Sequence, residues 1–181
     1  MTKARLFAIL VILALPVWLR ADQTWTLASS TLTYHISHPL HEADGVSHAA
    51  RGQGICTGGE CNFLIAVPVK TFNSGNSNRD LHMLEAVRGG QYPLVVVRFR
   101  LPAAELRQPV IRADLEVQLA GQTAEYKQVA FHRADQGKDI RVTGTIPLKL
   151  SDFKIKPPSL LAIPIRNDVP VRVDTVWRLQ S

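Results

Sequence analysis

Strict alternation of apolar and polar residues recurs along most of this chain, and it constrains the fold more than any other feature. Between positions 111 and 119 apolar side chains occupy every second position, with Arg112, Asp114 and Glu116 between them. Further strands are expected at residues 31–40, 95–101, 125–133, 140–150 and 169–179, while residues 63–69 alternate only loosely. Because successive side chains of a strand point to opposite faces, many such segments joined by short turns predict an antiparallel sheet with one apolar face. About eight such strands favour a closed barrel, since closure removes exposed edges.

The apolar positions of these strands are mostly small or medium-sized, which would leave room inside a barrel. Val, Ile, Ala and Leu dominate, Phe99 and Trp177 are the main bulky exceptions, and aromatic residues make up 7% of the chain. A barrel of about eight strands is either filled by its own side chains or holds one small ligand. The residues alone leave both alternatives open.

The phase of the alternation selects the residues that would contact an apolar ligand, and a slip of one residue would turn a whole set outward. The nine candidates are Val95, Val97, Phe99, Leu115, Val117, Ile146, Leu148, Val171 and Val173. The loop 151–164 contains Leu160 and Leu161 and is a candidate apolar flap over one end of the barrel; an ordinary surface loop is the alternative.

The N-terminus has the build of a secretory signal peptide. Lys3 and Arg5 precede an apolar run at residues 6–19, and cleavage is expected near Ala21. The run is shorter than the roughly 20 apolar residues that span a bilayer. An uncleaved membrane anchor is the alternative interpretation. Export to the periplasm follows from the signal-peptide interpretation.

The charge of the chain depends on this leader. Loss of residues 1–21 removes Lys3, Arg5 and Arg20, so that the formal charge falls from +6 to +3. The remaining basic residues are spread along strands rather than clustered, which argues against a nucleic-acid partner. Residues 22–181 suffice for a single domain with a core of its own.

The two cysteines, Cys56 and Cys61, flank the turn-forming residues 57–60. An even number of cysteines in an exported protein indicates a disulfide, and a glycine-rich turn would bring paired strands within bonding distance. A redox-active pair is the alternative, but the usual two-residue spacing and helix N-terminus are missing. We therefore expect a structural disulfide that fixes the register of a hairpin.

A polar, turn-forming run at residues 74–83 opens a helical pattern in a chain otherwise written in strands. Ser77, followed three residues later by Asp80, has the spacing of an N-terminal cap. Apolar residues at helical spacing continue to Val87, and the glycines at 89–90 are expected to end the helix.

The run Asn76-Ser77-Asn78-Arg79-Asp80-Leu81-His82, followed by Tyr92-Pro93, resembles a motif of the YceI-like family of bacterial periplasmic proteins. Residues 25–34 are similar to the opening strand of that family, and residues 150–155 to a late segment, although His48 stands where the family often has Gly. The resemblance covers nearly all of residues 22–181. It implies an all-β fold: an eight-stranded antiparallel lipocalin-like barrel with one or two short helices in its connections.

The same resemblance implies binding rather than catalysis. Several proteins of this family hold a polyisoprenoid or another long amphiphile along the barrel axis. We therefore expect a periplasmic carrier, sensor or sequestering protein for a lipid-like small molecule of polyisoprenoid or isoprenoid-quinone type, without a cofactor. Transient contact with a membrane and a homodimer are left open by the sequence.

Histidines supply a rival hypothesis, a periplasmic metal-binding protein. The cluster from His35 to His48 contains four histidines, and imidazole is the commonest metal ligand. On a regular strand His35 faces opposite to His38, so the alternative metal site consists of His38, His41 and His48 with a neighbouring carboxylate. The spacing matches no fixed ligand pattern.

An enzyme is not expected. The sequence has neither a Gly-x-Ser-x-Gly elbow nor a glycine-rich phosphate loop before a helix. Arg79, Asp80 and His82 could be drawn as a catalytic trio, but Asp80 is better explained as an acid that interacts favourably with a helix start.

Overall fold

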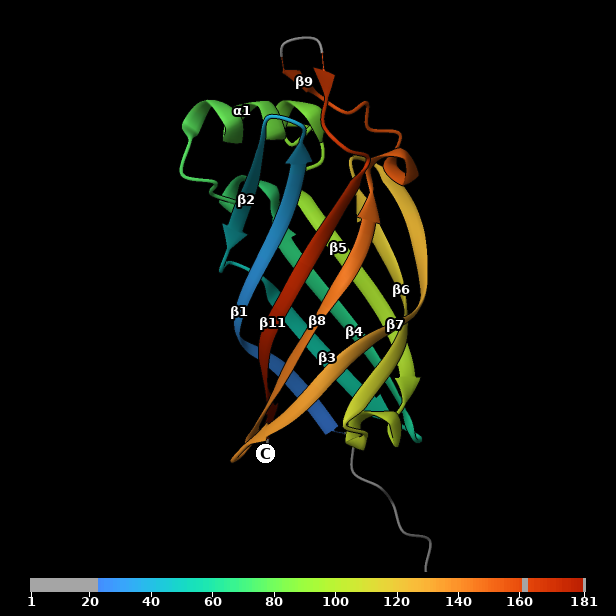
Figure 1. Cartoon of the computed structure of the whole chain (residues 1–181). Helices are drawn as coiled ribbons and strands as arrows, with labels where there is room; N and C mark the ends of the chain where they lie inside the picture. The colour runs from blue at the N-terminus through green and yellow to red at the C-terminus, as the bar shows by residue number, and fades with distance from the viewer. Residues whose placement is uncertain (1–22, 161–162, 181) are drawn as a thin grey trace, which may run out of the picture.

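Eight antiparallel strands form a closed barrel, because the last strand of the chain pairs with the first. In the computed structural model, which describes residues 23–160 and 163–180, β11 (Asp168–Gln180) runs antiparallel to β1 (Gln23–His38). The other neighbouring pairs are antiparallel too, so the predicted lipocalin-like barrel is confirmed (Figure 1). Between β1 and β11 the wall consists of β3 (Arg51–Thr57), β4 (Glu60–Pro68), β5 (Leu94–Pro102), β6 (Val110–Leu119), β7 (Gln122–Gln136) and β8 (Asp139–Lys149).

The predicted signal peptide, residues 1–21, lies outside the described residues, and its cleavage near Ala21 stays a prediction. Within the part of the chain that the structure describes, no helix is both long and apolar enough to cross a membrane. A short helix was expected in a connection, and α1 (Ser77–Ala86) confirms it: together with the 3-10 turn η1 (Val69–Thr71), it joins β4 to β5.

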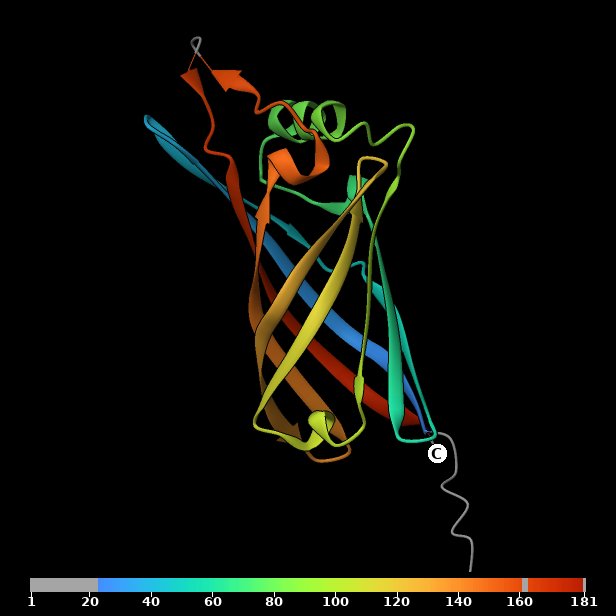
Figure 2. The ribbon, with the colours of Figure 1, turned by 90° about the vertical axis from the view of Figure 1, so that its right-hand side faces the viewer.

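The segment after β1 forms two strands, which the sequence pattern did not separate. β2 (His41–Ser47) pairs with β1 from Leu32 to His38, whereas β3 pairs with the start of β1. β3 continues the wall to β4, but the backbone of β2 pairs beyond β1 through one bridge, between Val46 and Asn73, beside a side-chain hydrogen bond of 2.6 Å between Ser47 and Thr71. The β1–β2 hairpin therefore leans away from the barrel wall at one end (Figure 2).

Aromatic side chains fill the gap that opens between β2 and β4. The ring centroids of Tyr34, on β1, and Phe72, which follows η1, lie 5.5 Å apart. Tyr34 folds over the glycine opposite it, because a Cβ at Gly45 would lie only 2.2 Å from its ring. Gly45 thus makes room for the ring that closes this part of the wall.

The ends of α1 differ from the prediction by a residue or two. Asn76, not Ser77, is the N-cap, and its side chain accepts a hydrogen bond from the Arg79 backbone N–H at 3.0 Å. The helix ends at Ala86, and the left-handed residue after it is Arg88, with φ of 54°, rather than a glycine. Both Asn and Ser are good N-caps, so the pattern fixed the helix but not its first residue.

The end of the barrel that carries α1 is called the mouth here. It is formed by α1, the tip of the β1–β2 hairpin, the 3-10 turn η3 (Leu150–Phe153) and the short pair β9 (Ser159–Leu160) and β10 (Ile163–Pro164) (Figure 1). The expected flap at 151–164 belongs to this end. It is anchored by the buried side chains of Phe153 and Ile155, which join the core, while Leu161 lies outside the described residues.

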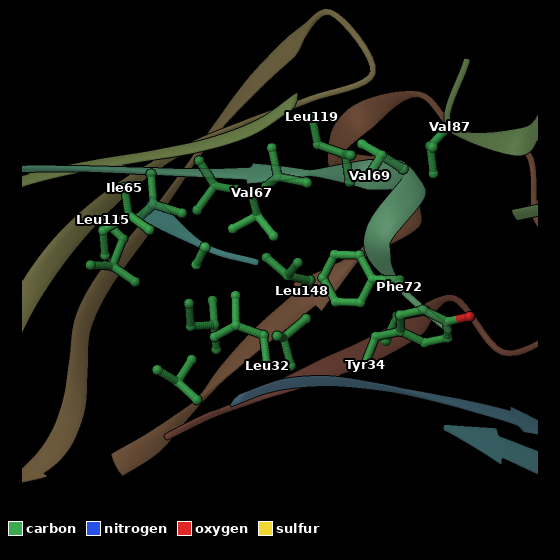
Figure 3. A pocket seen from close by; sticks show the side chains of 18 of the residues that line it. Leu32, Tyr34, Ile65, Val67, Val69, Phe72, Val87, Leu115, Leu119 and Leu148 are labelled. Atoms are coloured by element: carbon green, nitrogen blue, oxygen red, sulfur yellow. The ribbon is translucent and has the colours of Figure 1, made fainter. Parts of the chain in front are cut away.

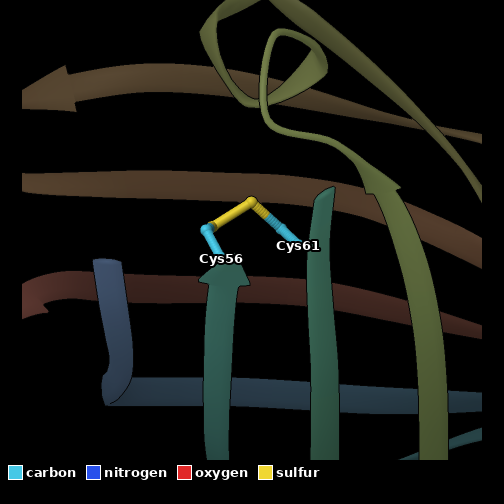
Figure 4. The surroundings of a disulfide bond; sticks show 2 residues. All are labelled: Cys56 and Cys61. Carbon is cyan, nitrogen blue, oxygen red and sulfur yellow. A yellow bond between two sulfur atoms is a disulfide. The ribbon is translucent and has the colours of Figure 1, made fainter. Parts of the chain in front are cut away.

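The opposite end, called the disulfide end here, has tighter connections. Cys56 and Cys61 are directly opposite in the β3–β4 register and form the predicted disulfide (Figure 4). Gly58 and Gly59 make the two-residue turn between them, both with positive φ, which suits the twist of a hairpin. The 3-10 turn η2 (Glu105–Arg107) joins β5 to β6 at the same end (Figure 2).

Candidate functional site

The barrel encloses a cavity of about 460 Å³, which falls in the usual range of about 300–1,000 Å³ for ligand pockets. Its walls are inward-facing side chains from β1, β4, β5, β6, β7, β8 and β11, and they are almost entirely aliphatic or aromatic. Figure 3 shows Leu32, Ile65 and Leu115 among the side chains that point into this space from different strands.

The nine residues selected by alternation all line this cavity. Leu115 and Val117 are the most deeply buried of them, Ile146 is buried too, and the other six are partly covered. The full set consists of Val95, Val97, Phe99, Leu115, Val117, Ile146, Leu148, Val171 and Val173. The alternation phase thus placed these side chains on the inner face, while their contact with a ligand stays a prediction.

Sequence reasoning left out a second group of lining residues. Alternation was visible on β1 and β4, and it would have selected Leu32, Ile65 and Val67, which line the same cavity. β1 also carries a bulge between Leu27 and Ser29 that reverses its phase. Trp25 and Leu32 therefore reach the interior from odd and even positions of one strand.

The floor of the cavity is an aromatic cluster near the disulfide end. Phe63 stacks on Phe99 with ring centroids 4.8 Å apart and meets the edge of Trp177 at 5.3 Å. Such pairs add to the stability gained from burial. The bulky exceptions noted in the sequence, Phe99 and Trp177, thus lie together near one end of an interior that is lined mostly by smaller residues.

Polar lining residues gather at the mouth. Asn76, Arg79 and His82 come from α1 and its cap, His41 from the hairpin tip, and Lys149 from the end of β8. The sequence did not predict this group, because α1, the hairpin tip and the end of β8 are far apart in the chain and are brought together only by the tertiary fold.

Tyr34 marks the boundary between the apolar interior and this polar mouth. Its side chain is buried and lines the cavity, and its hydroxyl has no hydrogen-bond partner among the described residues. Burial, reinforced by the charge of Asp80, raises the pKa of Tyr34. The hydroxyl therefore stays protonated at physiological pH and can donate a hydrogen bond.

The histidine hypothesis fails on geometry. His38 donates from Nε2 to the Ile163 carbonyl oxygen and accepts at Nδ1 from the Leu40 N–H, so both ring nitrogens are occupied. His48 lies at the far end of β2 and donates from Nδ1 to a backbone carbonyl. At about 3.3 Å per residue, β2 separates His41 from His48 by roughly 20 Å. Within residues 23–160 and 163–180, no three potential ligands cluster to hold a metal ion.

Arg79 and Asp80, two of the three residues that could be drawn as a catalytic trio, make structural contacts at the start of α1. Asp80 Oδ1 accepts hydrogen bonds from the Ser74 N–H at 3.0 Å and from the Ser74 hydroxyl at 2.5 Å. Arg79 donates from Nε to the Ser74 hydroxyl oxygen and from Nη2 to the Ser74 carbonyl, both at 2.9 Å. Asp80 therefore orders the loop before the helix and makes no hydrogen bond with His82.

A closed antiparallel barrel with a large apolar interior and a polar mouth has the architecture of the lipocalin-like fold. No family model matches the sequence, and no curated protein is significantly similar to it. Solved structures, however, share the fold.

Two of these structures have TM-scores near 0.7. A polyisoprenoid binding domain from Saccharophagus degradans has a TM-score of 0.67 at 16% identity, covering 86% of this chain and 98% of that one. BcnA from Burkholderia cenocepacia has a TM-score of 0.68 at 14% identity, covering 81% and 95%. A YceI protein from Campylobacter jejuni, with a TM-score of 0.51 at 14% identity over 66% and 72%, is more distant. The chain has the YceI-like fold that the sequence motif suggested.

Proposed function

We propose that this protein binds a long apolar or amphiphilic molecule, of polyisoprenoid or isoprenoid-quinone type, inside its barrel. The cavity carries the proposal, because its walls offer an aliphatic surface and leave about 460 Å³ unfilled. A structure with the same fold is a polyisoprenoid binding domain, which supports this class of ligand. The protein would act as a carrier, sensor or sequestering protein rather than as an enzyme.

Burial of apolar surface is the proposed source of affinity. Each CH₂ group removed from water contributes about 0.8 kcal/mol, and a five-carbon isoprenoid unit brings several such groups. A few units would therefore offset the cost of ordering the ligand and of losing its free motion. The aromatic floor limits how deep the tail enters, and the polar mouth holds the other end.

Export to the periplasm is part of the proposal. The signal peptide predicted at residues 1–21 supports it, and so does the Cys56–Cys61 disulfide, since disulfides persist mainly in oxidising compartments. A periplasmic protein that binds lipids must take them from a membrane or return them to one.

Exposed apolar side chains at the mouth fit transient membrane contact. Leu40 at the hairpin tip, Leu81 on α1 and Ile163 on β10 are 61%, 53% and 40% exposed. They belong to three different elements that surround the mouth (Figures 1 and 2). Insertion of these side chains among lipids would bring the mouth of the cavity to the bilayer surface.

The proposal is tested by mass spectrometry of an organic extract from protein that was exported in bacteria and purified without detergent. We expect a polyprenyl or quinone-like lipid at about one molecule per chain. Metal content is measured on the same sample. A protein that carries no lipid and does not take up added polyprenols would overturn the proposal, and one metal ion per chain would revive the histidine hypothesis.

A further inference from the structure

The charged side chains that line the cavity are all basic. Among the described residues, Arg79, Lys149 and three histidines line it, and no aspartate or glutamate does. The chain contains 15 acidic residues, so carboxylates are available but are placed elsewhere. A ligand with a positive head would find no partner in this lining, whereas a negative head would find several.

The cationic groups stand where the head of a bound amphiphile would lie. Arg79 and His82 are three residues apart on α1 and therefore share one face of the helix. Lys149 ends β8, and α1 and this end of β8 both lie at the mouth (Figure 1). The apolar tail would fill the barrel below them, and the head would meet these groups at the rim.

Arg79 differs from Lys149 in its partners. Lys149 Nζ lies 3.5 Å from an Asp168 carboxylate oxygen, so its charge is partly balanced. Arg79 forms no salt bridge with a carboxylate within residues 23–160 and 163–180. Its two hydrogen bonds to Ser74 fix the guanidinium by Nε and Nη2 and leave Nη1 unused.

A buried donor lies in the same region. Tyr34 is 7% exposed, and its hydroxyl, at the edge of the group drawn in Figure 3, has no hydrogen-bond partner among the described residues. A buried hydroxyl without a partner is costly. An acceptor atom on a ligand head would remove that cost. The unpartnered hydroxyl therefore supports a polar head independently of the charges at the mouth.

We propose that the physiological ligand carries an anionic head, a carboxylate or a phosphate, and that Arg79 binds it at the mouth. This inference rests on the proposed function, because it assumes that the tail occupies the barrel. A guanidinium suits both heads, since its planar array of N–H donors matches their oxygens. Ser74 orients Arg79 before the ligand arrives, and Tyr34 and His82 offer further hydrogen bonds to the head.

The test compares ligands that share one tail. Geranylgeraniol, geranylgeranyl phosphate and geranylgeranoic acid are titrated into delipidated protein, with tryptophan fluorescence as the signal because Trp177 lies at the cavity floor. The anionic ligands should bind about tenfold more tightly than the alcohol. Their advantage should shrink at 0.5 M salt, because Arg79 is only half-buried. Comparison of the phosphate with the acid identifies the head.

Variants assign the preference to Arg79. Arg79→Gln should remove the difference in affinity between the anionic ligands and the alcohol. Arg79→Lys should keep part of the preference, since the charge remains without the planar array. Arg100→Gln is the matched control, because Arg100 is exposed on β5 and does not line the cavity. It should alter neither affinity.

The outcomes separate this inference from the proposed function. Equal binding of all three ligands to the wild type, or an anion preference that survives Arg79→Gln, would refute the anionic head and leave the lipid-binding barrel intact. Binding of none of them would overturn both. If Arg79→Gln does not fold, the salt dependence of the wild type and the Arg79→Lys variant decide the question.

Discussion

The two ends of the barrel are closed by different means. The disulfide end is held by a two-residue turn, a covalent bond and the stack of Phe63, Phe99 and Trp177. At the mouth, α1 covers the opening although none of its residues is fully buried, and β2 is joined to η1 and the residues that follow it by one backbone bridge and one side-chain hydrogen bond. Regions with few buried contacts open at the lowest free-energy cost. The difference indicates that the mouth opens at a lower free-energy cost than the disulfide end, and under the proposed function a ligand would enter there.

The largest expected effect comes from filling the space between the two ends. Val117→Trp places an indole in the cavity from a position that is 1% exposed. Lipid retention, measured by mass spectrometry of the organic extract, should be abolished, while the barrel still folds with a loss of roughly 1–3 kcal/mol from overpacking. Leu64→Trp, at a 48% exposed site on the outside of β4, is the control and should retain lipid. Undiminished lipid in Val117→Trp would show that the ligand lies elsewhere.

The second prediction compares exposed apolar residues at the two ends. Serine at Leu40, Leu81 and Ile163 should slow lipid uptake from vesicles containing phosphatidylglycerol by about tenfold, because three side chains that enter the bilayer are lost. The control has serine at Ile55, Leu64 and Leu179, which are similarly exposed away from the mouth. Transfer of a fluorescent polyprenol from the vesicles gives the rate. Equal rates in both triple variants would argue against docking by the mouth.

Removal of the disulfide should destabilise the disulfide end without changing the affinity for the ligand. Cys56→Ser with Cys61→Ser should lower the free energy of unfolding by about 2 kcal/mol, since the loop closed by this bond is short. Urea denaturation measures the change, and dithiothreitol should reproduce it in the wild type but have no effect on the double variant. Loss of lipid affinity in proportion to stability would mean that the two ends are not independent.

Asp80→Ala tests whether the motif before α1 is structural. The carboxylate loses two hydrogen bonds from Ser74 and its favourable place in the first turn of α1, which should cost about 1 kcal/mol in urea denaturation. Affinity for geranylgeraniol should not change, because the tail contacts lie deeper in the barrel. Asp80→Asn keeps an acceptor and should recover part of the stability. Weaker geranylgeraniol binding at full stability would make Asp80 a functional residue.

The smallest effect concerns the pH dependence of the β1–β2 hairpin. Hydrogen bonds from His35 Nδ1 and Arg172 Nη2, both at 2.7 Å, lower the pKa of Asp44. The ionised form is therefore favoured in the folded state, and its stabilisation is complete above the unfolded pKa of about 3.9 and lost as pH falls through the lower folded value. Asp44→Asn should lower the free energy of unfolding by a few tenths of a kcal/mol at pH 7 and leave it unchanged at pH 2. The effect is small because the Asp44–Arg172 ion pair is exposed. Urea midpoints across this range measure it, and a constant difference between variant and wild type at every pH would contradict the assignment.

Sequence reasoning recovered the barrel because most strands repeat one simple pattern. β5, β6, β8 and β11 place their inner residues at every second position, so the phase of Val117 or Val173 could be read directly. The segment from His41 to Gly54 has no such pattern, being rich in small residues and histidines, and the division into β2 and β3 was missed.

The polar part of the candidate site could not be read from the sequence in the same way. Arg79 and Lys149 are far apart in the chain, and only the closed barrel brings their elements to one end. The histidines are close in the sequence, but His38 and His48 each donate a hydrogen bond to a backbone carbonyl, which no local pattern reveals. Bulges are equally hard to predict. A bulge at Gln128, which has a φ of 52°, shifts the register of β7 against β6, and the neighbouring residues do not indicate it.

The single bridge between Val46 and Asn73 has a consequence for the girth of the barrel. Neighbouring strands of the barrel cannot separate without breaking a ladder of hydrogen bonds, whereas β2 is held to η1 and the residues that follow it by the two backbone bonds of this bridge, at 2.9 Å each, and by the Ser47–Thr71 side-chain hydrogen bond at 2.6 Å. The circumference is thus fixed at the disulfide end and adjustable at the mouth, so the protein should tolerate differences in ligand thickness better than differences in tail length. Hydrogen exchange measured with and without lipid tests this: the Val46 and Asn73 amides should exchange faster than those of β3, and a thicker ligand should widen the contrast.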